Sequence, residues 1–291
     1  MDLSIIIVNY KTKQLTLQTL ESVFAARPPK NKLEVILVDN GSDDDTPEAV
    51  GRDYPEVKII ESRENLGFAG GNNLGLRRAK GRYQLLLNSD TLIESDTLVK
   101  MIDFMDNHPR VGLATCRVEL AGGKIDPASH RGFPTPWASL TYYLGLERLW
   151  PKSRLFGRYH QGWKDLHAIH EIDTPVGAFF MIRHEVLRQV GLLDEKFFMY
   201  GEDIDLAFRI KQAGWQISYA PITRITHLKG ASGINKPVKD IRIKTTKAFF
   251  EAMKLFYKKH YTKKYGFAVK WLVFWGIDGV KLWKIAKIKF F

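Results

Sequence analysis

The chain has 291 residues, of which 45% are hydrophobic, so it is long and apolar enough for one α/β domain with an appendage or for two domains. Its single cysteine, Cys116, excludes an internal disulfide and a zinc site built from several cysteines, and we expect a buried thiol in a reducing compartment. Basic and acidic side chains balance over residues 1–235, at 29 each, whereas residues 236–291 hold 15 basic and 3 acidic ones, so the tail carries the entire net charge of +12.

Short apolar runs alternate with helical patterns from the N-terminus to Asn107. We expect strands at 3–8, 34–39, 57–61 and 83–88, and helices near 13–26, 46–54, 69–79 and 96–107. Strands that are apolar throughout and separated by helices predict a mostly parallel, Rossmann-like sheet with helices on both faces. In such sheets, ligands bind beyond the carboxyl ends of the strands. Those ends carry a polar set here: Asn9-Tyr10, Asp39-Asn40, Glu61 and Asn88-Ser89-Asp90.

The pattern loosens after Arg117. Residues 121–170 contain Gly, Pro, His and Trp without a clear period, which predicts an irregular insertion. Regularity returns with a strand at 178–183, helices at 184–190 and 204–213, and a strand near 216–220. We therefore expect a domain over residues 1–235 that is followed by a helical tail over 236–291.

Two segments that follow strands each have two interpretations. At 39–42, Gly41 and Ser42 suit a turn that caps the next helix, which is favoured when the segment is taken alone, but Asp39 could also accept a hydrogen bond from a nucleotide base. Residues 65–75 hold four glycines and three asparagines. Their amides could approach phosphate or sugar oxygens, or the glycines could pack a helix close to the sheet. No Gly-x-Gly-x-x-Gly fingerprint occurs there.

Candidate metal ligands follow the fourth strand. Asn88-Ser89-Asp90 ends an apolar run, so Asp90 has a well-fixed position. Mg²⁺ is commonly held by one or two carboxylates together with substrate phosphates, which points to a nucleoside-diphosphate substrate. His227, after a late strand, is either a second ligand or a structural histidine.

Three acids, Glu202, Asp203 and Asp205, open a later helix. The helix dipole favours acids in a first turn, which would explain them without any chemistry. Three carboxylates within four residues nevertheless exceed what capping needs. The preceding aromatic run, residues 197–200, would place one of them at the edge of a dry pocket as a general base.

Taken together, these segments resemble family 2 glycosyltransferases of the GT-A fold, because they occur in the same order along residues 3–233. The sequence Asn-Leu-Gly-Phe-Ala-Gly-Gly-Asn at 65–72 is similar to the rhamnosyltransferase-like branch. The resemblance implies inverting transfer of a sugar, such as rhamnose, from a dTDP- or UDP-linked donor. The implied acceptor is a hydroxyl of a lipid-linked glycan in cell-surface polysaccharide assembly, and the irregular insertion would face that acceptor.

The resemblance also implies roles for single residues. Asp203 matches the catalytic base, which Glu202 and Asp205 would support. Asp90 and His227 match a site for Mg²⁺ or Mn²⁺. The other implied contacts are Asn9, Asp39, Gly67, Asn88 and Ser89 for the nucleotide, with Asp39 at the base, and Gly177, Ala178 and Trp215 on the acceptor side.

Two points in this assignment stay open. Asn88 stands where the family's metal motif has its first acid, so the site has one carboxylate fewer, and Asn88 could bind the ribose instead. Trp215 could shape the acceptor side or simply pack against a helix, and packing is the favoured interpretation. A sugar nucleotidyltransferase and a non-catalytic, membrane-bound sugar-binding module are the alternative functions.

Basic residues alternate with bulky apolar ones in the tail, over 239–261 and 265–291. So many aromatic residues disfavour a nucleic-acid-binding arm and favour an amphipathic helix on an anionic membrane surface. No uncharged apolar run is long enough to span a bilayer, and no signal peptide is evident, so we expect a peripheral protein on the cytoplasmic face of the cell membrane. The alternative is a tail that packs on the catalytic core or on a second subunit of a homodimer.

Overall fold

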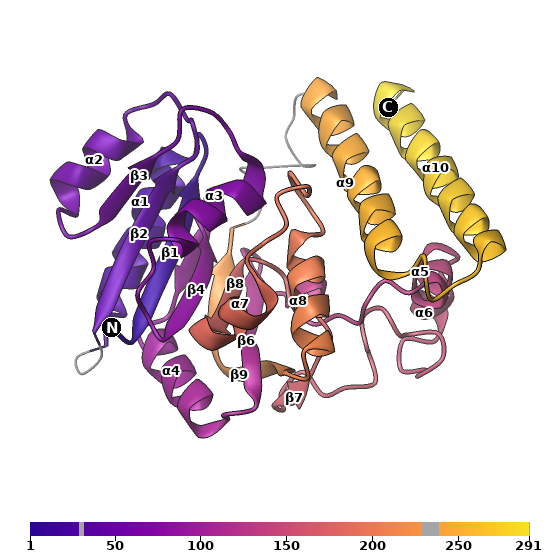
Figure 1. Ribbon diagram of the computed structural model, residues 1–291, viewed down its shortest axis with the longest axis horizontal. Coiled ribbons are helices and arrows are strands. Elements are labelled where there is room, and N and C mark those ends of the chain that lie inside the picture. Colours follow the sequence, from indigo (N-terminus) through magenta and orange to yellow (C-terminus); the bar gives the residue numbers. More distant parts are fainter. Residues whose placement is uncertain (29–31, 229–238, 291) are drawn as a thin grey trace.

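The computed structural model describes residues 1–28, 32–228 and 239–290. Within them the chain forms one nine-stranded sheet with helices on both faces (Figure 1). The strands are β1 (Leu3–Asn9), β2 (Leu33–Asp39), β3 (Lys58–Glu61), β4 (Tyr83–Asn88), β5 (Thr91–Ile93), β6 (Val111–Leu120), β7 (His170–Glu171), β8 (Phe179–Arg183) and β9 (Gln216–His227). The helices are α1 (Lys13–Ala25), α2 (Thr46–Asp53), α3 (Gly67–Leu76), α4 (Thr97–Asn107), α5 (Pro136–Tyr143), α6 (Leu146–Leu149), α7 (His184–Val190), α8 (Glu202–Gln212), α9 (Lys239–His260) and α10 (Phe267–Phe290).

The predicted α/β fold is confirmed, with one refinement of the sheet. The strands run in the order β3-β2-β1-β4-β8-β6-β9-β5, and β7 pairs with β9. The four strands predicted before Asn107 form the parallel part, in which β1 pairs with β2 and β4, and β2 pairs with β3. Beyond β4 the sheet is mixed, because β8 lies antiparallel between β4 and β6.

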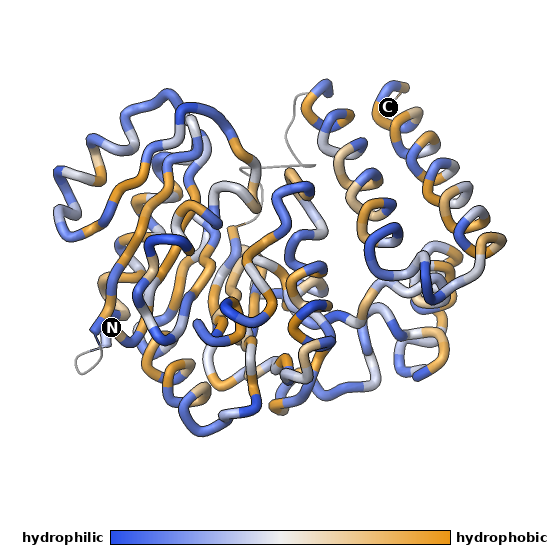
Figure 2. Tube along the Cα trace, in the orientation of Figure 1, coloured by the Kyte–Doolittle hydropathy of each residue, from blue (hydrophilic) through white to orange (hydrophobic). Residues whose placement is uncertain are grey.

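Alternating residues of the central strands serve two separate cores. Ile5 and Ile7 of β1 face a core that includes residues of α1 and α4, whereas Ile6 faces a core with residues of α3, α7 and α8. The strands are accordingly the most hydrophobic part of the trace in Figure 2. Cys116 is fully buried in the first core, as expected for a structural thiol.

The register of the strands gathers the polar ends at one edge of the sheet. Asn9 is the partner of Asp39, and Asn88 is the partner of Val8 in the adjacent pair. At its far end, β9 pairs with β5, where His227 is the partner of Thr91. The pairing therefore brings His227, from late in the chain, next to residues 88–90.

The insertion at 121–170 is less irregular than expected, because it contains α5 and α6. Thr135 caps α5 by accepting a hydrogen bond from the backbone N–H of Ala138, at 3.2 Å, and Pro136 occupies the first helical position. Strands β5 and β6 were not predicted either. Their identity as strands depends on pairing with β8 and β9, which lie much later in the chain.

The tail consists of two antiparallel helices at one end of the molecule (Figure 1). A third apolar cluster joins α9 to the α/β domain, because Phe256 and Tyr261 pack with Phe197 and Phe208. None of the helices in the described ranges combines enough length with enough hydropathy to cross a bilayer. The expected boundary between residues 235 and 236 lies outside the described residues, as does Phe291, the last residue of the expected tail.

Candidate active site

The first part of the site is a buried network at the ends of β1 and β2. The Asn9 side chain donates to Asp39 Oδ1 at 2.8 Å and to Ser42 Oγ at 2.9 Å, and the Ser42 N–H donates to Asp39 Oδ2 at 3.1 Å. Asn9 Oδ1 in turn accepts from the hydroxyl of Thr12, at 2.9 Å. Asn9 therefore fixes the orientation of the Asp39 carboxylate, and its own side chain is fully buried.

The same network reaches the loop after β4. The hydroxyls of Thr12 and Ser89 lie 3.1 Å apart, and Thr19 donates to the Ser89 carbonyl at 2.9 Å. Ser89 and Asp90 are both nearly buried. The loop that carries Asp90 is thus held from α1 as well as from its own strand, which gives the carboxylate the fixed position that a metal ligand needs.

The candidate metal ligands converge beyond β4. His227 Nε2 lies 3.2 Å from Asp90 Oδ1 and 3.3 Å from Asn88 Nδ2. The other ring nitrogen, Nδ1, lies 3.8 Å from Asp126 Oδ2. A carboxylate behind a histidine ligand is a common way to fix the orientation of the ring. Asp126 belongs to the insertion, and it was not predicted because no motif marks it.

This donor set fits a divalent metal that shares its ligands with a substrate. In the described part of the chain, no three His, Cys, Asp or Glu side chains gather into a metal cage of their own. Asp90, His227 and the Asn88 amide supply few donors, which suits Mg²⁺ or Mn²⁺ completed by phosphate oxygens and water better than it suits a structural zinc site.

Two glycines of the glycine-rich segment allow close packing against neighbouring elements. A Cβ atom on Gly75 would lie 2.4 Å from the Ile6 side chain, so this glycine lets α3 approach the sheet. Gly67 has a φ of +73°, and a Cβ there would lie 2.1 Å from the carbonyl oxygen of Phe198. The Phe68 N–H donates to that same carbonyl, at 2.8 Å. Gly67 therefore joins the start of α3 to the aromatic loop before α8.

Asp203 lies at the start of α8 and is held by a cation. Its Oδ2 accepts a hydrogen bond from Arg131 at 3.0 Å, and its Oδ1 accepts from the N–H of Ile204 at 2.8 Å. Both side chains of the ion pair are largely buried. Burial opposes the charged form of Arg131, but Tyr159 and Asp203 outweigh that effect and raise its pKa. Arg131 is a second residue of the insertion that was not predicted.

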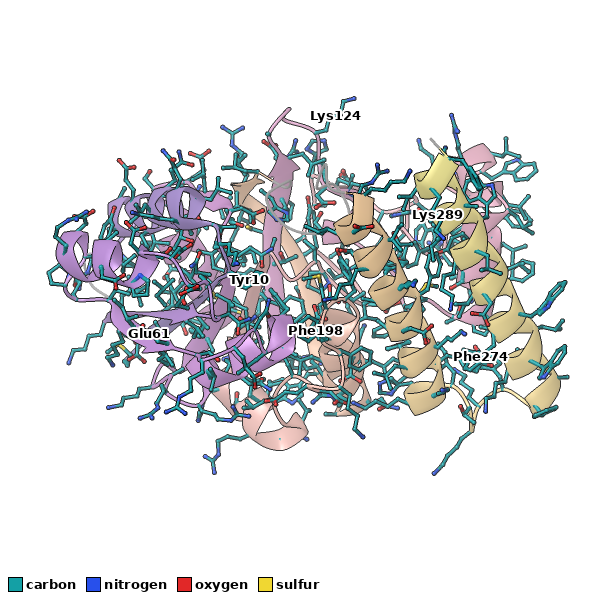
Figure 3. All side chains as sticks on the ribbon, turned by 90° about the horizontal axis from the view of Figure 1, so that it is seen from above. Tyr10, Glu61, Lys124, Phe198, Phe274 and Lys289 are labelled. Carbon is teal, nitrogen blue, oxygen red and sulfur yellow. The ribbon has the colours of Figure 1, made fainter. Side chains whose placement is uncertain are left out.

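A short path of contacts connects Asp203 with the metal ligands. The position of a Cβ atom on Gly177 lies 3.9 Å from the Cβ atom of Asp203. The next residue, Ala178, accepts a hydrogen bond from the N–H of Asn88 at 3.2 Å. Figure 3 looks down on this edge of the sheet, with Tyr10 after β1 and Phe198 before α8 labelled on it. Gly177 and Ala178 thus lie between the candidate base and the candidate metal site.

The neighbour of Asp203 has unusual electrostatics. Burial, reinforced by the charge of Asp203, raises the pKa of the Glu202 carboxyl well above its ordinary value. Within the described residues its Oε2 atom has no hydrogen-bond partner. A buried carboxyl next to a carboxylate is most stable in its protonated form. The pair therefore favours the protonated form of Glu202, and Asp203 stays the candidate base.

Asp205 faces away from this edge, toward the tail. It is fully buried and accepts hydrogen bonds from Arg209 at 2.9 Å and from His260 at 2.7 Å, and Lys259 lies 2.8 Å away. Two of these partners are in α9. Asp205 thus supports the site by fixing α8 to the tail, and contact with a substrate is not part of its role.

Trp215 is not brought to the site. It precedes β9, whereas His227 ends that strand, so the two lie roughly 35–40 Å apart along the strand. Its indole N–H donates to Gln189 at 2.8 Å, and the side chain packs near Gly112. The interpretation that Trp215 packs against helices therefore fits its position, and we do not retain it as an acceptor contact.

Comparison with known proteins identifies the family. The model of the family described as glycosyl transferase family 2 matches residues 4–191, more than half of the chain. The chain belongs to glycosyl transferase family 2. The resemblance drawn from the order of motifs is thereby confirmed, and with it the assignment as a glycosyltransferase.

Curated relatives of this family 2 chain have names that describe glycan assembly. It is 26% identical over 215 residues to the N-acetylglucosaminyl-diphospho-decaprenol L-rhamnosyltransferase of Mycobacterium tuberculosis, covering 69% of this chain and 68% of the relative. It is also 26% identical over 249 residues to the low-salt glycan biosynthesis hexosyltransferase Agl10 of Haloferax volcanii, covering 84% and 71%.

Solved structures share the GT-A fold. The mannosyltransferase PcManGT from Pyrobaculum calidifontis, solved with GDP-Man and Mn²⁺, has a TM-score of 0.63 at 18% identity, covering 99% of this chain and 72% of its own. Residues 1–349 of TarS from S. aureus, solved with UDP-GlcNAc, have a TM-score of 0.58 at 18% identity, covering 94% and 70%. At this identity the likeness shows the fold alone.

Proposed function

We propose that this family 2 glycosyltransferase is an inverting enzyme that moves a sugar from a nucleoside-diphosphate donor to a hydroxyl of a lipid-linked glycan. The observation that carries the proposal is the path from Asp203 through Gly177 and Ala178 to Asn88. This path lies between the Asp203 carboxylate, which we propose as the base, and the end of β4, which is followed by Asp90. A single displacement requires this arrangement, because the base must act on one side of the sugar and the leaving diphosphate must depart on the other.

In the proposed reaction, Asp203 takes the proton of the acceptor hydroxyl while that oxygen forms a bond to the anomeric carbon of the sugar. The bond between that carbon and the diphosphate oxygen breaks, and its electron pair leaves with the nucleoside diphosphate. A divalent metal bound at Asp90 and His227 would stabilise the charge that develops on the diphosphate. Arg131 would hold the base in position, and the raised pKa of Glu202 favours its protonated form beside it.

The donor would lie across the carboxyl ends of β1, β2 and β4. Asp39, oriented by Asn9, would accept a hydrogen bond from the nucleobase. Asn88 and Ser89 would contact the ribose and the diphosphate. Gly67 would shape this site through its contact with the loop at Phe198. We propose a dTDP- or UDP-linked donor, with rhamnose as the first sugar to test, because the relative from M. tuberculosis is named a rhamnosyltransferase.

We further propose that the acceptor is attached to a polyprenyl-diphosphate lipid and that the protein acts as a peripheral protein on the cytoplasmic face of the cell membrane. The tail would hold it there, because α10 exposes three tryptophans within a segment that is strongly basic. A tail-mediated homodimer is the competing arrangement. We propose no nucleic-acid partner.

Release of nucleoside diphosphate tests the proposal. The purified chain is incubated with dTDP-rhamnose, UDP-GlcNAc or GDP-mannose, each with membrane lipid extract as the acceptor source and with Mg²⁺, Mn²⁺ or a chelator. We expect one donor to release nucleoside diphosphate in a reaction that depends on both metal and acceptor. Formation of a nucleoside triphosphate and a sugar 1-phosphate when pyrophosphate is added to the donor would instead indicate a nucleotidyltransferase. Binding of a donor without any turnover would indicate a sugar-binding module.

A further inference from the structure

Exposed apolar side chains are concentrated in two distant segments of the chain. Of the 21 large hydrophobic residues that are exposed in the described ranges, eight lie in 137–155 and eight in 267–290, so most of them come from these two short segments. The first group is Trp137, Leu140, Tyr142, Tyr143, Leu144, Leu149, Trp150 and Leu155, and the second is Phe267, Val269, Trp271, Leu272, Trp275, Leu282, Trp283 and Phe290.

The two segments lie side by side. Figure 1 shows α5 and α6 next to one end of the α9–α10 pair, and the view from above in Figure 3 places them directly beside α10. The hydroxyl of Tyr143 in α5 lies 3.8 Å from the sulfur of Met253 in α9. The insertion and the tail therefore form one end of the molecule, on the far side from β1 to β3. We call the surface formed by residues 137–155 and by α10 the docking face.

The charged side of α10 faces α9. Asp278 pairs with Lys254 at 2.6 Å, Lys281 pairs with Glu251 at 2.9 Å, and the Lys284 ammonium lies over the Phe250 ring. Because these contacts fix the rotation of the helix, its apolar stripe points away from the protein. Trp271, Trp275 and Leu282 fall within about 40° of one another on that stripe, and Trp275 is 74% exposed.

We propose that the docking face binds an anionic membrane surface and that the insertion is half of it. Charge as well as hydrophobicity favours this partner. Residues 137–158, which extend the first segment of the docking face by three residues, contain four basic side chains, all exposed, and one acid, Glu147, which is buried. Exposed lysines also lie at both ends of α10. The basic residues are Arg148, Lys152, Arg154 and Arg158 in the insertion and Lys263, Lys264, Lys287 and Lys289 in the tail.

This composition matches a lipid headgroup region more closely than another copy of the chain. Tryptophan and tyrosine favour the membrane interface, and lysine and arginine near an anionic leaflet add attraction. Lysine is depleted at protein–protein interfaces, and two such basic faces would repel each other. The inference rests on the proposed function and deepens it, because it fixes which side of the enzyme meets the lipid-linked acceptor.

The test measures cosedimentation of the full chain with vesicles. One set contains equal parts phosphatidylglycerol and phosphatidylcholine, and the other contains phosphatidylcholine alone. The insertion variant carries Leu144→Ser, Leu149→Ser and Trp150→Ser, and the tail variant carries Trp271→Ser, Trp275→Ser and Trp283→Ser. Ile169→Ser is the matched control, because Ile169 is 48% exposed but precedes β7, at the far end of the sheet from β3 and away from α10.

We expect the wild type and the Ile169→Ser variant to bind the anionic vesicles, with binding that weakens as salt is added. Each triple variant should bind at least about tenfold more weakly, because three apolar side chains that would enter the membrane are lost. Wild-type binding by the insertion variant would overturn its place in the docking face. If the wild type ignores anionic vesicles at low salt, or forms a dimer that the tail variant disrupts, the membrane is the wrong partner.

Nucleotide binding separates this inference from the proposed function. Affinity for UDP and dTDP, measured without vesicles, should be the same in the wild type and both triple variants, because the docking face lies apart from the site. If no protein binds a nucleotide while vesicle binding follows the expected pattern, the proposed function fails and the docking face stands.

Discussion

Arg131 donates a hydrogen bond to Asp203 across 3.0 Å, from the insertion to the first turn of α8. The same guanidinium also donates to the Pro175 carbonyl at 3.0 Å, so it joins the proposed base to the segment before β8. A planar guanidinium with several donors can hold two acceptors in fixed directions, which an ammonium group cannot do equally well. Arg131 is therefore a positioning residue for the proposed base.

Replacing Arg131 should lower turnover more than donor affinity. For Arg131→Ala and Arg131→Lys we expect kcat to fall roughly tenfold to a hundredfold, because a base displaced by a fraction of an ångström no longer meets the acceptor hydroxyl correctly. Steady-state kinetics with varied donor should show little change in donor KM. A rise in donor KM at unchanged kcat would instead place Arg131 in the donor site.

Asp203→Asn keeps the shape of the side chain and removes the base. Turnover should fall by about 10²- to 10⁴-fold, the usual range for loss of a general base, while the nucleotide still binds. Single-turnover assays with the true acceptor and calorimetric titration of the nucleotide measure the two quantities separately. Wild-type transfer by this variant would rule out Asp203 as the base.

Asp90 and Asp39 should differ in their effects on metal and nucleotide. Asp90→Ala should weaken Mn²⁺ and nucleoside-diphosphate binding together, because both are proposed to meet at that carboxylate. Asp39→Ala should weaken the nucleotide and leave the metal response unchanged. Titration of Mn²⁺ and nucleotide into each variant makes the comparison, and unchanged nucleotide affinity in the Asp90 variant would contradict the shared site.

Replacing Asp205 should lower the stability of the fold rather than act directly on catalysis. Burial works against its charge, but hydrogen bonds from His260 and Lys259 outweigh it and lower the pKa. Asp205→Asn removes the buried charge that Arg209, Lys259 and His260 share, and we expect a loss of about 3 kcal/mol in the free energy of unfolding at pH 7. Because the folded-state pKa is lowered, the wild-type advantage should persist above about pH 4 and shrink as pH falls below it.

Urea denaturation across this pH range, with Asp103→Asn as the control, measures the effect of Asp205. Asp103 is exposed, so its variant should match the wild type. An Asp205→Asn protein as stable as the wild type at pH 7 would mean that the cluster between α8 and α9 contributes nothing.

For Glu202 we expect stability to depend on pH in the opposite direction. Its pKa is raised in the folded protein, so the unfolded chain loses this proton at about pH 4.3 while the folded chain keeps it. Its contribution to stability is therefore complete below that pH and is lost as pH rises through the folded-state pKa. Glu202→Gln should match the wild type at about pH 4 and gain on it by about pH 8, whereas the exposed control Glu185→Gln should not. Parallel pH profiles of urea denaturation for wild type and Glu202→Gln would contradict the raised pKa.

Local patterns were sufficient to predict the parallel half of the sheet. β4 and α7 have the predicted bounds, because apolar periodicity and polar ends define such elements within a few residues. The antiparallel insertion of β8 between β4 and β6 depends on pairing between segments that are far apart in the chain. No local pattern reports that pairing, so the change from a parallel to a mixed sheet was not predictable.

The residues of the candidate site likewise fall into those that local motifs predict and those that they do not. Asp39, Asp90 and Asp203 belong to motifs whose order is recognisable, whereas Asp126 and Arg131 lie in a segment without period or motif. The alternation of basic and apolar residues predicted a helix at the end of the chain, which the structure shows as α10. Which side faces the protein depends on Glu251 and Lys254 of the neighbouring helix, and that choice required the structure.

The backbone hydrogen bond from Phe68 to Phe198 joins α3, on the proposed donor side, to the loop before α8, which leads to the proposed base Asp203 and so to the acceptor side. Because Gly67 lets the two backbones touch, a shift in the first turn of α3 would press on the loop before α8. A donor that draws α3 inward would therefore reshape the acceptor side before the acceptor arrives. Occupancy of either side should tighten the other by the same factor, as reciprocity requires, and the enzyme would favour an ordered sequence with the donor first.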